Sequence, residues 1–177
     1  MGKILILLLL LTVILLRPNL KDRHPGYTAD MKRINKQASA LSAGFAALKI
    51  TPEVPDSWKD ANGDARYNPK DGDTYTDGNG NGKFDPVWMA GFSNSKPASG
   101  IHDDLWARCM VVDDGKTRVA LVVLDAIGLM HDDVVDIRKL IPEKAGVAYT
   151  IVSSTHNHET PDLMGLWGKT PFKSGVN

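Results

Sequence analysis

A continuous apolar run at residues 119–124 constrains the fold of this chain more than any other segment. A strand that is apolar at every position fits the centre of a sheet covered on both faces. Residues 105–113 form an apolar, β-branched run before it, and the Asp114-Gly115 pair between the two runs predicts a β-hairpin. Because an apolar strand, a helix-periodic segment at 132–141 and another apolar run at 147–153 follow in order, we expect a βαβ crossover. The sequence therefore predicts an α/β fold with a mixed sheet and helices packed on it.

The N-terminus carries a second apolar segment, residues 4–16, between Lys3 and Arg17-Pro18. It is shorter than the roughly 20 residues that a membrane span needs, but it suits the apolar region of a signal peptide. Since no A-x-A cleavage pattern follows, a cleaved signal peptide (1–16) and an uncleaved anchor both stay open. We expect a secreted, periplasmic or membrane-anchored protein.

The rest of the chain divides into a polar linker at 17–46 and a folded part at 47–177, which opens with a short strand stopped by Pro52. The 21 basic residues balance the 21 acidic ones, so no broad basic face argues for nucleic acid. Cys109 is the only cysteine, which excludes an intrachain disulfide.

Residues 56–86 are rich in Asp, Asn and Gly and contain an internal repeat, in which 60–69 recurs at 77–86. Each copy has oxygen-bearing side chains at positions 1, 3, 5 and 9, the ligand spacing of an EF-hand calcium loop. They are Asp60, Asn62, Asp64 and Asn68, with Asp71 at position 12, in the first copy, and Asp77, Asn79, Asn81 and Asp85 in the second.

Ala65 departs from the usual Gly at position 6 and Trp88 from the usual acid at position 12, and no helix pair flanks the loops. The alternative is that these residues simply form turns. The repeat in register favours bound calcium in a structural role, because an ion could replace the apolar core that this insertion lacks.

Two histidines, His156 and His158, follow the last predicted strand, and Asp125 follows the strand before it. Sites in such sheets gather at the carboxyl ends of the strands. Residues i and i+2 of an extended chain point the same way, so both imidazoles could face one cleft and bind zinc. The alternative is a pair of satisfied loop histidines. Taken alone, His102 reads as a turn residue.

Several ordered stretches resemble the amino-terminal part of the neutral, non-lysosomal ceramidase family. The matching stretches are Ile50-Thr51-Pro52, Ala90-Gly91-Phe92, Gly100-Ile101-His102 with Trp106-Ala107-Arg108, residues 118–125, and Ser154-Thr155-His156-Asn157-His158-Glu159-Thr160-Pro161. The last is similar to the family's Gly-Thr-His-Thr-His-Ser-Gly-Pro box, with Glu159 and Thr160 in place of its Ser and Gly.

The resemblance implies a zinc-dependent amide hydrolase that cleaves the N-acyl bond of a ceramide-like lipid through a metal-activated water. It makes His156 a zinc ligand and His158 a catalytic neighbour that contacts the substrate or the water. Gly91 and His102 would line the same cleft, with His102 also catalytic.

The family completes its zinc site with a histidine, a glutamate and a tyrosine far downstream, in sequence that this chain does not contain. Residues 47–177 would then be an incomplete catalytic domain, so we expect the chain alone to bind zinc weakly and hydrolyse nothing appreciable. An N-acylated or other lipid substrate and a membrane surface are the expected partners.

Two other functions stay open. One is a calcium-dependent extracellular binding module without catalysis, in which the histidines are incidental. The other is a metal amidohydrolase of a different family, although an amidohydrolase barrel normally places its His-x-His after the first strand, whereas three strands and a helix precede it here.

Overall fold

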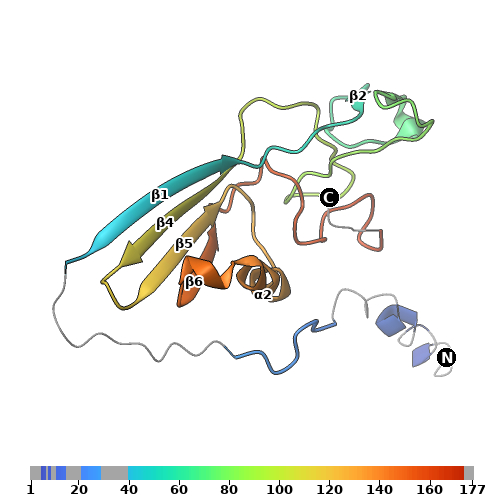
Figure 1. Ribbon diagram of the computed structural model, residues 1–177. Coiled ribbons are helices and arrows are strands. Elements are labelled where there is room, and N and C mark those ends of the chain that lie inside the picture. Colours follow the sequence, from blue (N-terminus) through green and yellow to red (C-terminus); the bar gives the residue numbers. More distant parts are fainter. Residues whose placement is uncertain (1–4, 7, 9–10, 15–20, 29–39, 174–177) are drawn as a thin grey trace.

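The computed structural model describes residues 5–6, 8, 11–14, 21–28 and 40–173. They form a mixed α/β fold, mostly strand, with a four-stranded mixed sheet and a separate two-stranded sheet (Figure 1). The large sheet has the strand order β1-β4-β5-β6. Its elements are β1 (Ser42–Lys49), β4 (Trp106–Asp113), β5 (Arg118–Leu124), helix α2 (His131–Leu140), the 3-10 helix η2 (Glu143–Ala145) and β6 (Tyr149–Ser154).

The predicted hairpin and crossover are both confirmed. Strands β4 and β5 pair antiparallel through a tight turn, in which the amide of Asp114 donates to the carbonyl of Thr117 at 3.2 Å. Strands β5 and β6 pair in parallel, with α2 between them in the chain. Strand β5 is therefore an inner strand of the sheet, as its continuous apolar run predicts.

Strand β1 begins at Ser42, five residues before the predicted start of the folded part, and pairs antiparallel with β4 up to Lys49. The sequence around Gly44 is rich in alanine and has no strand-type alternation. Backbone pairing with β4 rather than side-chain pattern makes this segment a strand. The end of the predicted linker thus belongs to the sheet.

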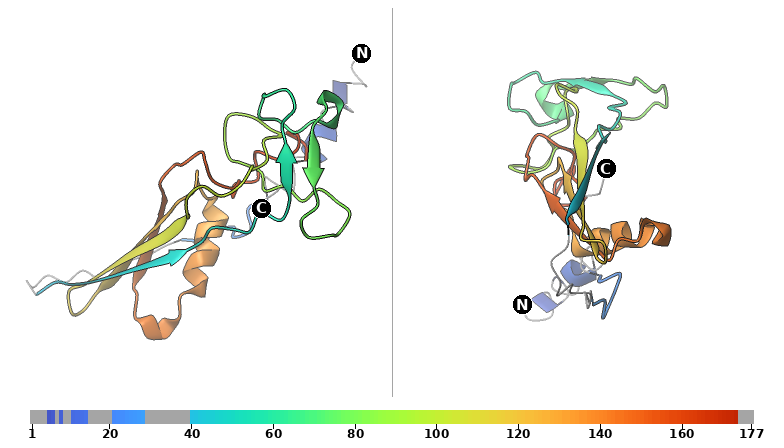
Figure 2. Two further views of the ribbon diagram at one scale, coloured as in Figure 1. Left: turned by 90° about the horizontal axis from the view of Figure 1, so that it is seen from above. Right: turned by 60° about the vertical axis from the view of Figure 1, so that its left-hand side comes forward.

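Helix α2 packs against one face of the sheet, beside β6 (Figure 2). Val135 of the helix is fully buried, and Ala120 and Thr150 on the sheet are 4% and 3% exposed. Arg138 adds a hydrogen bond from its Nε to the carbonyl of Thr150 at 2.9 Å. This face holds most of the small apolar core of the sheet.

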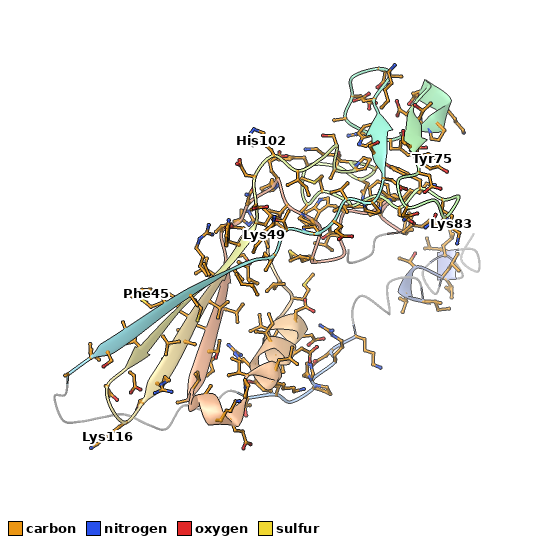
Figure 3. All side chains as sticks on the ribbon, turned by 45° about the horizontal axis from the view of Figure 1, so that its top comes forward. Phe45, Lys49, Tyr75, Lys83, His102 and Lys116 are labelled. Carbon is orange, nitrogen blue, oxygen red and sulfur yellow. The ribbon has the colours of Figure 1, made fainter. Side chains whose placement is uncertain are left out.

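The opposite face of the sheet carries an apolar row that the described residues leave open. The row follows the strand register across all four strands, through Phe45, Met110, Leu121 and Ile151. Phe45 is 77% exposed and Ile151 45% exposed, and Figure 3 shows Phe45 standing out from β1. The expectation that β5 is covered on both faces is therefore wrong within the part of the chain described here, because α2 covers one face alone.

Parts of the predicted leader and linker lie within the described residues. Residues 5–6, 8 and 11–14 are helical, whereas residues 15–20 and 29–39, which include the end of the predicted leader and much of the predicted linker (17–46), lie outside the described residues. A search of the described residues finds no helix with the length and apolar character to cross a membrane. The segment 21–28 lies along α2, where the amide of Arg23 donates to Asp132 at 2.7 Å and His24 Nε2 lies 2.7 Å from Asp136.

The insertion at 56–86 has a folded structure of its own, away from the large sheet (Figure 1). Strands β2 (Ser57–Lys59) and β3 (Thr74–Thr76) pair antiparallel, and the 3-10 helix η1 (Pro69–Asp71) lies between them. Four rings form an aromatic cluster, with Tyr67 and Phe84 at 4.3 Å, Tyr75 and Phe84 at 5.0 Å, and Trp58 and Tyr67 at 6.0 Å between centroids. This cluster supplies an apolar centre that the polar composition did not predict.

Candidate functional site

The two histidines lie where the chain leaves the carboxyl ends of β5 and β6, which point toward the loop-rich part of the molecule (Figure 1). The exit of β6 continues alongside the exit of β5. The amide of Thr155 donates to the carbonyl of Leu124 at 2.9 Å, and the amide of Asn157 donates to that of Ala126 at 3.2 Å. These bonds fix the backbone on both sides of His156.

His156 has a left-handed backbone, with φ of 57°, and its Nδ1 lies 2.9 Å from the carbonyl oxygen of Ile127. A carbonyl oxygen only accepts, so Nδ1 carries the proton and donates it. The neutral ring then keeps its lone pair on Nε2. A carbonyl partner of this kind is typical of metal-binding histidines, because it fixes both the tautomer and the ring orientation.

His158 lies close to His156, with the ring centroids 5.1 Å apart and the planes nearly perpendicular at 89°. Its Nδ1 is buried and has no hydrogen-bond partner in the described part of the chain. Gly91, with φ of 89°, lies directly against this ring, since a Cβ at that position would fall 1.9 Å from Nδ1. Phe92 covers another part of the ring at 4.6 Å between centroids. The predicted site residues Gly91, His156 and His158 thus come together.

His102 lies elsewhere. Its side chain is 96% exposed, its Nδ1 lies 2.7 Å from the Asp103 carboxylate, and it projects from the loop before β4 (Figure 3). It borders a hollow of about 570 Å³ that is also lined by Asn157 and Glu159. Neither His156, His158 nor Gly91 lines this hollow. The structure therefore does not bring His102 into the cleft of Gly91 and His158.

The carboxylate of Asp125, which follows β5, forms hydrogen bonds within the fold. Its Oδ2 accepts from the amide of Trp106 at 2.9 Å and from the Arg108 guanidinium at 2.8 Å. Within the described residues, no group of three or more His, Cys, Asp or Glu side chains is arranged to hold a metal ion. For zinc, this part of the chain offers one or two imidazoles.

Asp162 departs from the glycine that the ceramidase box has after Pro161, and its structural role was not predicted from the sequence. It is fully buried, and its carboxylate accepts from the amides of Met164 and Gly165 at 2.9 Å and of Trp167 at 2.6 Å. Its own amide donates to the carbonyl of Trp88 at 2.8 Å. These bonds hold the segment before Gly91 beside the segment after His158. An aspartate three residues before a glycine is a turn signal that could have indicated it.

The two predicted calcium loops have the same backbone conformation. Asp60 accepts from the amides at positions 4 and 6 of its loop, Gly63 and Ala65, both at 2.7 Å. Asp77 accepts from the corresponding amides of the second loop at 2.6 Å. In both loops positions 4 and 6 have left-handed φ, including 59° at Ala65. The position-6 amide in particular lowers the pKa of each aspartate below its usual value, which keeps the carboxylates charged.

The other predicted calcium ligands converge in the second loop more than in the first. Asn79 and Asn81 both donate to the carboxylate of Asp85 and lower its pKa. In the first loop the side chains separate into two pairs, with Asn62 bonded to Asp64 and Asn68 bonded to Asp71.

Two further buried aspartates brace these loops from outside. Asp73, 4% exposed, accepts from the amides of Ala61 and Asn68, positions 2 and 9 of the first loop, at 2.9 and 2.8 Å. Asp56, 2% exposed, accepts from the amides of Gly78 and Asp85, positions 2 and 9 of the second loop, at 3.0 and 2.7 Å. The sequence analysis missed them, although they too are 17 residues apart and extend the repeat by four residues.

No model of a protein family matches the chain, and no solved structure matches it significantly.

Proposed function

We propose that this chain forms the amino-terminal part of the catalytic domain of a zinc-dependent hydrolase that cleaves the amide bond of an N-acylated, ceramide-like lipid. The observation that carries the proposal is the bond between His156 Nδ1 and the Ile127 carbonyl at 2.9 Å. This bond fixes the imidazole and leaves the lone pair of Nε2 available to bind a metal. The ring lies at the carboxyl edge of the sheet, where sites of this fold class gather.

The described residues fit one part of a zinc site. His156 would hold the metal through Nε2, and bound zinc would supply a Lewis acid that lowers the pKa of a coordinated water toward 7. His158 is placed to contact the substrate or the attacking water, because its ring lies 5.1 Å from that of His156. Gly91 leaves room for the His158 ring, and Asp162 holds the two segments together.

The open sheet face supports a larger catalytic domain than the one described. Phe45 at 77% and Ile151 at 45% exposure belong to its apolar row, and contiguous exposed apolar side chains of this kind mark a surface for further contacts. Further structure over the apolar row of the sheet would bury these side chains and bring additional metal ligands to the same edge.

A zinc titration of the full 177-residue chain tests the proposal, followed by NMR signals of the histidine rings. We expect weak binding that perturbs His156 first and disappears in His156→Ala. The matched control is His131→Ala, an exposed histidine on α2, which should leave the titration unchanged. Zinc that perturbs all five histidines equally would contradict the site. Appreciable zinc-dependent release of fatty acid from a short-chain ceramide analogue by this chain alone would contradict the inference that the remaining zinc ligands lie outside it.

The duplicated loops support a second function, the binding of calcium in a structural role. The supporting observation is that Asp60 and Asp77 accept hydrogen bonds from the amides at positions 4 and 6 of their loops in the same way. Extracellular calcium modules work at about 10⁻⁴–10⁻³ M, which agrees with the exported location that the apolar leader predicts.

Thermal unfolding in calcium and in magnesium tests this second function. We expect calcium to raise the melting temperature of the chain, and Asp77→Ala to abolish the increase, because the second loop gathers more of its ligands. Asp103→Ala, an exposed carboxylate outside the loops, is the control. An equal effect of both ions, or a response that survives Asp60→Ala combined with Asp77→Ala, would contradict specific calcium loops.

A further inference from the structure

Phe92 has a backbone conformation that is unfavourable for a bulky residue, and the fold does not require a bulky residue at this position. Its side chain is 82% exposed and its φ is 62°, a region that bulky residues rarely adopt. Gly91 and Ser95 of the same turn are also left-handed, with φ of 89° and 60°. A glycine at position 92 would keep the turn without strain. Exposed apolar area and backbone strain at one residue indicate a functional position.

Neighbouring segments hold this turn in place. The amide of Ser95 donates to the carbonyl of Gly168 at 2.9 Å, and its hydroxyl donates to that of Lys169 at 2.6 Å. The amide of Tyr67, in the first calcium-type loop, donates to the Ser95 carbonyl at 2.7 Å. The position of Phe92 is therefore determined by two other parts of the chain.

Phe92 also borders an open hollow of about 640 Å³, whose other walls come from residues 64–71 and 169–171. This volume is in the range of small-molecule sites. The side chain thus lies between the His158 ring on one side and the hollow.

The chemistry of the walls defines the class of ligand. In the calcium-free chain two carboxylates, Asp64 and Asp71, are balanced by two cations, Arg66 and Lys169, so the wall carries no net charge toward a ligand. Amide and hydroxyl side chains share the remaining wall with Tyr67, Pro69 and Pro171, so the wall offers both polar and apolar contacts. Such walls fit a neutral ligand with many hydroxyl groups and one apolar face.

We propose that this hollow binds a saccharide ring, with the ring's apolar face stacked on Phe92 and its hydroxyls bonded to the polar walls. The site is separate from the proposed zinc position and requires no zinc. It would serve either a sugar-bearing substrate at the neighbouring His158 or a free saccharide.

NMR titration of the full chain with glucose, N-acetylglucosamine and maltose, without added zinc, tests this site. We expect saturable shifts of the Phe92 ring and the Asn94 side-chain amide with at least one of these sugars. Phe92→Gly should weaken binding at least tenfold while the melting temperature stays the same or rises, because glycine relieves the strained φ. Phe45→Ala, an equally exposed phenylalanine on β1, is the matched control and should bind normally.

Further variants separate this inference from the proposed zinc function. His156→Ala should bind the sugar as the unaltered chain does, so loss of zinc binding and loss of sugar binding are independent results. Arg66→Met, in the opposite wall, should weaken binding at least threefold and covers the case in which Phe92→Gly fails to fold. Absence of any saturable shift, or unchanged affinity in both wall variants, would overturn the proposal. Preferential binding of phosphate or octanoate would also overturn it.

Discussion

Replacement of Gly91 by alanine is a direct test of how the candidate site is built. The added Cβ would lie 1.9 Å from His158 Nδ1, 2.6 Å from Cε1 and 3.1 Å from Cγ. Carbon atoms pack best at about 3.5–4.0 Å, so the imidazole would have to move by more than about 1.5 Å. His158 could not keep its position beside His156.

The expected loss of stability has two parts. A left-handed φ of 89° costs alanine about 1–2 kcal/mol relative to glycine. The overlap with a half-buried ring adds about 1–3 kcal/mol, as for other overpacked positions. We therefore expect Gly91→Ala to lower the free energy of unfolding by about 2–5 kcal/mol in urea titrations.

Gly115→Ala provides the matched control, because Gly115 has φ of 83° and no atom within 4 Å of the added Cβ. It should show the backbone part of the loss alone, with unchanged NMR signals of the His158 ring. Equal losses in the two variants, together with unmoved His158 signals in Gly91→Ala, would refute the close packing of Gly91 against the ring.

Three other predictions concern the aspartates. Asp162→Ala should destabilise the chain by several kcal/mol in urea, because each of three amides left without a partner costs about 1–3 kcal/mol when buried, whereas exposed Glu159→Gln should change little. Asp73→Ala should increase hydrogen exchange of the first loop (60–68) and Asp56→Ala that of the second (77–85); the opposite assignment would contradict the crossed bracing. Asp60 and Asp77 have pKa values below the usual 3.8 in the folded loops, so their charged carboxylates stabilise the loops at any pH above that value. Loop order followed by NMR should be constant at neutral pH and fall as the pH drops through the lowered pKa values. Loss of loop order already near pH 6 would contradict stabilisation by these two carboxylates.

The sequence predicted the centre of the large sheet well because its signals there are local. The run in β5, the Asp114-Gly115 turn and the periodicity of α2 each predict one element, and the helix between two apolar strands predicts the parallel pair. Strand β1 was placed late because its pairing comes from β4, a partner about 60 residues away, and not from its own pattern.

The candidate site was predicted in part. His156 and His158 lie close together as expected, although the backbone at His156 is left-handed and not extended, and Gly91 lies against His158. The separation of His102 could not be predicted, because it depends on the course of the loop before β4, which leaves this side chain exposed and away from Gly91 and His158. The turn that Asp162 caps is a local feature, but its backbone bond to Trp88 is a long-range contact that no local pattern encodes.

The insertion shows how a repeat in sequence becomes a pair of loops in space. Each loop follows one strand of the β2–β3 pair, and each buried aspartate precedes one strand. Since the strands are antiparallel, Asp56 lies beside the loop that follows β3, and Asp73 beside the loop that follows β2. Neither loop can therefore form its bracing bonds without the other strand. A change that disorders β2 or β3 should therefore loosen the loop that follows the other strand. Tyr67 of the first loop bonds to Ser95, so disorder in that loop should also reach the turn that holds Phe92 against His158.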